Sequence, residues 1–114
     1  MSRDIKQYLD DILQAIRDIE QYTANIKDFE EFSSGAMRVH AILYNLEIIG
    51  EAVKNIPAAM KRKYSYVEWR KMAGLRDIVA HEYFGVSLEI VWGVIRNNLP
   101  LVKEQIEGIL SEIE

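Results

Sequence analysis

The sequence predicts an all-α protein, an up-and-down four-helix bundle with minor extra helices. Apolar residues recur at spacings of three and four along much of the 114-residue chain, and no segment alternates convincingly as a β-strand would. Internal repeats and Gly/Ser-rich linkers are absent from the sequence. Because helices joined by short connections usually pack as antiparallel neighbours, we expect residues 1–114 to form a single helical domain.

The first half of the chain predicts two long helices with a weaker helical segment, Asn25–Phe32, between them. The first helix is expected at about Asp4–Tyr22, where one apolar stripe is made by Ile5, Leu9, Ile12, Leu13, Ile16 and Ile19. The second is expected at about Ser34–Asn55, with an apolar face made by Met37, Ile42, Leu46, Ile49 and Val53. Pro57 restricts the residue before it, and therefore ends the second helix.

The second half predicts one or two helical turns and then three more helices. These are expected at about Pro57–Tyr64, Val67–Tyr83, Leu88–Asn97 and Leu99–Ile113. Ser87 is a suitable N-cap for the third of these stretches, and Asn98 for the last. Alternatively, the last two stretches form one helix that is kinked at Pro100.

The composition limits the chemistry and the location that we expect. There are no cysteines, which excludes disulfides, thiolate metal sites and a cysteine nucleophile. The first residues, MSRDIKQYLDDI, lack the apolar stretch of a secretory signal, and no uncharged run is long enough to cross a bilayer. We therefore expect a cytoplasmic protein with no membrane contact, and we expect no cofactor.

Basic residues are concentrated in one stretch of an otherwise acidic chain. The net charge is −4, but residues 54–76 carry +6, from Lys54, Lys61, Arg62, Lys63, Arg70, Lys71 and Arg76 against one acid, Glu68. This stretch is either a surface that attracts a polyanion such as RNA or a solvated connector. Three aromatic residues of this stretch, Tyr64, Tyr66 and Trp69, either stack on bases or pack in the core or at a dimer interface. The same alternatives hold for Trp92 on a later helix.

The segment GLRDIVAHEYFGV, residues 74–86, carries the sharpest signal for function. Helical spacing puts Arg76 and Tyr83 at one edge of the apolar face, which is formed by Met72, Leu75, Ile78 and Val79. Asp77 and His81 fall on the other side. The residues between the two groups are small (Ala73, Gly74 and Ala80), which favours close approach of another helix, such as one from a second subunit.

An arginine and a histidine are suitable groups for RNA cleavage without a metal. That reaction needs a base for the ribose 2′-OH, an acid for the departing 5′ oxygen, and a cation for the charge that builds up on the phosphate oxygens. Histidine serves as base or acid near neutral pH, and arginine binds phosphate with two parallel hydrogen bonds. A twofold dimer would bring two of each together. The alternative is a surface ion pair and an ordinary polar histidine.

Glu47 and Glu51 are spaced four apart on the expected second helix. With His40 they could bind a metal, although two histidines and few clustered carboxylates make that a poor site. Alternatively, one of them pairs with a buried arginine such as Arg76 and fixes its orientation. We therefore take Glu47, together with Asp77, as a candidate supporting residue.

Three blocks of the sequence resemble the HepT-like branch of the HEPN domains. Arg76, His81 and Tyr83 match the branch's motif of an arginine, four residues, a histidine, one residue and a tyrosine. NLEIIGEAVK at residues 45–54 resembles its second helix, WRKMAGLRDIVAHEYFG at residues 69–85 its third, and Val91-Trp92 with residues 98–106 its last helices. The position after the motif arginine is usually Asn in that branch, whereas here it is Asp77.

The resemblance implies a homodimeric helical bundle that acts as a ribonuclease toxin. It implies metal-independent cleavage by Arg76 and His81 in a cleft across the dimer interface, and a product with a 2′,3′-cyclic phosphate. The implied partner is a nucleotidyltransferase antitoxin (MntA-like) that transfers AMP to Tyr83. The modified tyrosine would block the cleft. A carboxylate at Asp77 can orient the His81 ring, but it can also repel phosphate. A non-catalytic module that presents RNA or nucleotide to such a partner is the alternative function.

Overall fold

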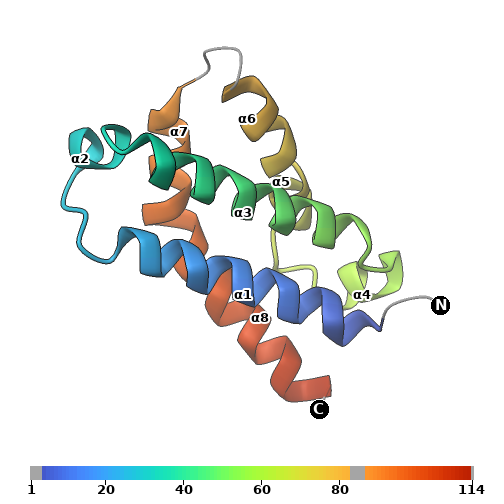
Figure 1. Ribbon diagram of the computed structural model, residues 1–114. Helices are drawn as coiled ribbons and strands as arrows, with labels where there is room; N and C mark the ends of the chain where they lie inside the picture. The colour runs from blue at the N-terminus through green and yellow to red at the C-terminus, as the bar shows by residue number, and fades with distance from the viewer. Residues whose placement is uncertain (1–3, 83–86, 114) are drawn as a thin grey trace.

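The computed structural model describes residues 4–82 and 87–113, apart from the side chains of residues 81 and 82. Throughout these residues the secondary structure is helical, without a β-strand, as the sequence predicts (Figure 1). The elements are α1 Ile5–Thr23, α2 Phe29–Ser33, α3 Ala36–Lys54, α4 Ala58–Lys63, α5 Trp69–Ala73, α6 Leu75–Glu82, α7 Leu88–Gly93, the π-helical segment η1 Val94–Asn98 and α8 Leu99–Ile113.

Helices α1 and α3 form an antiparallel pair that is joined by the short helix α2 (Figure 1). The side chain of Asp4 accepts a hydrogen bond at the start of α1, and the Gln7 side chain accepts one from the Asp4 N–H, which completes a capping box. All residues of the predicted apolar stripe on α1 are buried, apart from Ile5, which is half-buried. Asp28 caps α2 by accepting a hydrogen bond from the N–H of Glu31 at 2.9 Å.

Helix α3 is the central element, because it packs against α1, α2, α5 and α6. Four of its five predicted core residues are buried, but Met37 is 88% exposed and its assignment to the core was wrong. Tyr44, seven residues later and therefore on the same side of the helix, is 65% exposed. No other described helix covers this side of α3. The spacing of apolar residues along the sequence does not reveal that.

The predicted third helix is two helices, α5 and α6, which meet at Gly74. The N–H of Gly74 bonds to the carbonyl of Arg70, and the Gly74 carbonyl accepts hydrogen bonds from Asp77 and Ile78. Glycine has a low helix propensity, so the break falls at the residue where it costs least. Trp69 begins α5, and its indole N–H donates to the Tyr64 carbonyl at 3.0 Å.

The last two predicted helices are continuous from Leu88 to Ile113, which agrees with the alternative of one helix, but the irregularity in this helix lies before Pro100. Ser87 is the N-cap, as predicted, whereas Asn98 lies inside the helix and caps nothing there. The irregularity is the π turn η1, in which the N–H of Leu99 bonds to the carbonyl of Val94. The ring of Pro100 would clash with the carbonyl four residues earlier in a regular α-helix, and a wider turn just before it gives the ring more room.

The four principal helical segments are α1, α3, α5–α6 and α7–α8. In Figure 1 the α7–α8 segment crosses behind α1 and α3, and α8 packs along α1. Each of these segments contributes to one buried apolar cluster. No helix in residues 4–82 or 87–113 is long and apolar enough to cross a membrane.

Candidate active site

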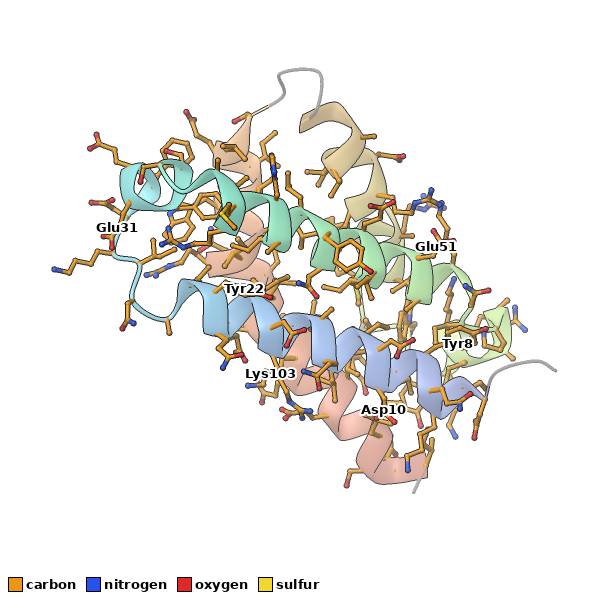
Figure 2. The ribbon with its side chains drawn as sticks, viewed as in Figure 1. Tyr8, Asp10, Tyr22, Glu31, Glu51 and Lys103 are labelled. Atoms are coloured by element: carbon orange, nitrogen blue, oxygen red, sulfur yellow. The ribbon has the colours of Figure 1, made fainter. Side chains whose placement is uncertain are left out.

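Arg76 lies in the first turn of α6, and its side chain reaches across to α3. Its Nη1 atom is 2.7 Å from Oε2 of Glu51, which forms an ion pair between residues 25 positions apart. Figure 2 shows Glu51 on the flank of α3 beside α5 and α6. The Arg76 side chain is 39% exposed and that of Glu51 is 56% exposed, so the pair is at a rim that solvent and ligands can reach.

Gly50 provides the space that the Arg76 side chain occupies. A Cβ atom at Gly50 would be 2.8 Å from Cγ of Arg76, and 3.2 Å from both the carbonyl oxygen of Ala73 and the backbone nitrogen of Arg76. Such distances are too short for ordinary contacts, so only glycine allows α6 to approach α3 this closely. Two consecutive residues of α3 therefore hold one arginine: Gly50 makes room for its stem and Glu51 binds its end.

Gly50 was not among the residues predicted to belong to the site, although the sequence contains a signal for it. A glycine inside a helix costs about 1 kcal/mol relative to alanine, so a glycine in the middle of α3 calls for a packing reason. The spacing of Glu47 and Glu51 left either of them as the partner of an arginine. The structure shows that Arg76 pairs with Glu51, while Glu47 is exposed one turn earlier.

The small residues near Arg76 have two different surroundings. The carbonyl of Ala73 faces Gly50, and Ala73 is half-buried against the core of its own chain, so at this point the close approach is intramolecular. Ala80, further along α6, is exposed. The expected close approach of another helix is therefore found within the chain at Ala73, and a second subunit over this face stays a prediction.

The remaining motif residues lie on or beyond α6. Asp77 is exposed in the first turn of this helix, and the backbone of His81 lies in its last turn. Positions 76 and 81 are roughly 140° apart around a helix and about 7.5 Å apart along its axis. The side chain of His81 and the whole of Tyr83 lie outside the described residues.

The basic candidates are divided between two short helices. Lys61, Arg62 and Lys63 form the second half of α4, which lies beyond the C-terminal end of α3 (Figure 1). Arg70 and Lys71 are exposed on α5, where Nζ of Lys71 is 3.1 Å from a carboxylate oxygen of Glu68. Arg70 and Lys71 therefore lie on the helix that immediately precedes Arg76, whereas His81 lies at the opposite end of α6.

Most of the aromatic candidates pack within the protein. Tyr64 and Trp69 are buried, and Trp92 stacks on Phe32 with 5.0 Å between ring centroids. Tyr66 is 57% exposed, which leaves it as the candidate among the four for stacking on a base. Among residues with described side chains, no group of three or more His, Asp or Glu residues is placed to hold a metal ion.

The described residues form an all-helical fold that holds an arginine at a solvent-exposed rim, with a histidine later on the same helix, and these two side-chain types are suited to binding and cleaving a phosphodiester. The comparison with known families makes this specific: residues 12–109 match the family model described as ribonuclease HepT-like. The chain belongs to the HepT-like ribonuclease family.

Named relatives agree with this assignment. The chain is 42% identical to the "Probable ribonuclease HepT" of Thermococcus cleftensis, over 96% of this chain and 98% of the relative. It is 41% identical to a "Putative RNase" of Methanocaldococcus jannaschii, over 98% of this chain and 92% of the relative. It also spans about half of a longer M. jannaschii protein named "Gamma-glutamylcyclotransferase and putative RNase", with 39% identity. No solved structure matches significantly.

Proposed function

We propose that this protein is a metal-independent endoribonuclease, the toxin of a toxin–antitoxin pair, with Arg76 and His81 as its catalytic residues. The observation that carries the proposal is the position of Arg76. The chain belongs to a ribonuclease family. Arg76 lies at an exposed rim of α6, where Glu51 holds it, and His81 follows five residues later on the same helix. Its guanidinium is therefore accessible to a phosphate group of RNA.

The proposed reaction is an attack of the ribose 2′-oxygen on the adjacent phosphorus. His81 removes the proton of the 2′-OH, a bond forms between the 2′-oxygen and phosphorus, and the bond from phosphorus to the 5′ oxygen breaks. A second imidazole, protonated, gives a proton to the departing oxygen. Arg76 stabilises the negative charge on the remaining phosphate oxygens. The products are a 2′,3′-cyclic phosphate and a free 5′-hydroxyl.

A homodimer provides the second imidazole. Arg76 turns toward α3, and position 81 is roughly 140° further around α6. A single chain therefore does not direct both side chains to one phosphate easily. Two chains related by a twofold axis can place the arginine of one beside the histidine of the other.

The proposed antitoxin is a nucleotidyltransferase that transfers AMP to Tyr83. A phenol that carries AMP adds a bulky anion two residues after His81, which would compete with RNA phosphate for Arg76. The basic residues of α4 and α5 would guide the RNA chain toward Arg76. Asp77, exposed one turn before His81, is proposed to orient the His81 ring.

One observation favours a second function, a non-catalytic module that binds RNA or nucleotide for a nucleotidyltransferase. The charge of Arg76 is already paired with Glu51 in the free chain, and Asp77 is an exposed acid beside it. Such a surface would bind RNA weakly and would not need to cleave it.

The two functions are distinguished by cleavage of total RNA in EDTA by the protein without AMP. We compare the wild-type chain with His81→Ala and Arg76→Ala, after circular dichroism has shown that all three are folded. Cleavage by the wild type alone, with 2′,3′-cyclic phosphate ends, supports the ribonuclease. If all three folded proteins leave RNA intact, the binding module is the better description. If His81→Ala cleaves as fast as the wild type, the catalytic assignment of His81 is wrong.

A further inference from the structure

The contact between α3 and the first turn of α6 fixes one side chain at two points. Cγ of Arg76 lies over Gly50, and the guanidinium at the other end of the same side chain is held by Glu51. A long arginine side chain has many accessible rotamers in solution. Restraint at both the stem and the end leaves few of them, so the direction of the guanidinium is set by α3 and not by α6 alone.

The opposite flank of α6 gives less support. There the helix borders a cavity of about 340 Å³ whose lining includes Leu75, Ile78, Val94, Leu99 and Val102. Of the long helices, α3 is therefore the one on which α6 packs closely. The position of Arg76 consequently depends on the Gly50–Glu51 segment more than on the C-terminal helix.

The ion pair leaves part of the guanidinium available. The carboxylate of Glu51 contacts Nη1, and a guanidinium has five N–H donors on three nitrogens. The side chain of Arg76 remains 39% exposed. A phosphate can therefore bind to the N–H groups that Glu51 does not use, while Glu51 still holds the group in place.

We propose that Glu51 is a positioning residue, which orients the Arg76 guanidinium so that its remaining N–H groups face the RNA phosphate. The catalytic part of this statement rests on the proposed ribonuclease function, whereas the orientation of Arg76 does not. Glu51 itself contacts no reacting atom. An exposed ion pair of this kind contributes little to stability, so removing it should change the order of Arg76 far more than the folding of the chain.

The first test measures the order of Arg76 directly. In ¹⁵N-labelled protein, the side-chain Nε–Hε resonance of Arg76 is assigned by its loss in Arg76→Lys. We expect it to be resolved from the other arginines in the wild type. In Glu51→Gln, which keeps the shape of the side chain but removes its charge, we expect it to move to the position of mobile arginines. A resonance unchanged by Glu51→Gln would overturn the proposal.

The matched control removes a different ion pair between helices. Nζ of Lys103 on α8 is 3.0 Å from Oε1 of Glu20 on α1, and the Glu20 side chain is 46% exposed, similar to Glu51. Figure 2 shows Lys103 beneath α1, away from Glu51. Glu20→Gln should leave the Arg76 resonance in place. If it disturbs this resonance as much as Glu51→Gln does, the effect is a general loosening of the bundle and the proposal fails.

The second test is kinetic and separates the two claims. For RNA cleavage, we expect Glu51→Gln to lower kcat by roughly 10- to 100-fold with a smaller change in KM, because misplacing a charge affects the transition state most. Glu51→Asp should recover part of the loss. If kcat is unchanged although the resonance has moved, Glu51 has no catalytic role. If the wild type does not cleave, the ribonuclease function fails, and the resonance still decides the orientation.

Discussion

At the scale of single residues, Gly50 and Arg76 are fitted to each other. The missing side chain of Gly50 leaves the space in which Cγ of Arg76 and the backbone of α6 lie. Gly108 on α8 is a useful contrast, because a Cβ atom there would meet no atom within 4 Å. The same substitution at the two glycines therefore has opposite expected effects.

We predict that Gly50→Ala destabilises the fold by about 1–3 kcal/mol, because the added methyl group forces α6 or Arg76 to move. Gly108→Ala should instead stabilise it by roughly 0.5–1 kcal/mol, because alanine is the better helix former. Urea denaturation followed by circular dichroism measures both. Equal stability of the wild type and Gly50→Ala would show that α6 is not closely packed on α3.

At the scale of elements, the short helix α4 concentrates positive charge at one end of the molecule. Lys61, Arg62 and Lys63 are consecutive, and none of them is buried. Nζ of Lys63 lies 5.4 Å from the centroid of the Tyr64 ring, which anchors one of the three. Since the buried residues of this region, Tyr64 and Trp69, lie outside α4, its charges can be changed without altering the core.

We predict that replacing Lys61, Arg62 and Lys63 together by Ala weakens RNA binding and leaves the thermal unfolding temperature nearly unchanged. Each lost phosphate contact should reduce the slope of log K against log salt by about 0.7 for single-stranded RNA. Binding is measured in the His81→Ala background, which prevents cleavage. Identical affinity and identical salt dependence before and after the change would remove α4 from the RNA surface.

The other elements show which features of the fold follow from local sequence. Helical periodicity placed α1, α3 and the C-terminal helix to within a few residues, because the spacing of apolar side chains is a local property. The break at Gly74 and the exposure of Met37 did not follow. The glycine marks the residue at which a break costs least, but whether a break occurs, like the exposure of Met37, depends on the neighbours that pack against each helix, and apolar spacing does not identify those neighbours.

At the scale of the whole molecule, the proposed active site needs two chains. Position 81 is turned away from the direction that Arg76 takes toward α3. The basic helix α4 and the C-terminal end of α6 are also far apart along the molecule (Figure 1). A site that combines Arg76 of one chain with His81 of the other would bring these features together.

We predict that the purified protein has twice the chain mass of 13.2 kDa by light scattering. Mixing equal amounts of the wild type and inactive His81→Ala, after reversible dissociation, should leave roughly a quarter of the wild-type activity. Half of the dimers are then mixed and hold a single His81 imidazole, whereas the proposed reaction uses two, so only the wild-type dimers cleave. Activity close to half of the wild-type value, in a mixture shown to contain mixed dimers, would mean that each site uses the residues of one chain.

Local sequence is sufficient to predict that the chain is helical, that Arg76 and His81 share one helix, and that basic residues precede them. These are properties of neighbours along the chain, which helical geometry fixes at short range. Three other features are seen only in the folded protein: Glu51 binds Arg76, Gly50 makes room for it, and Met37 faces outward. The physical reason is that these contacts depend on how α3 and α6 are placed against each other, and this placement results from the packing of the whole core.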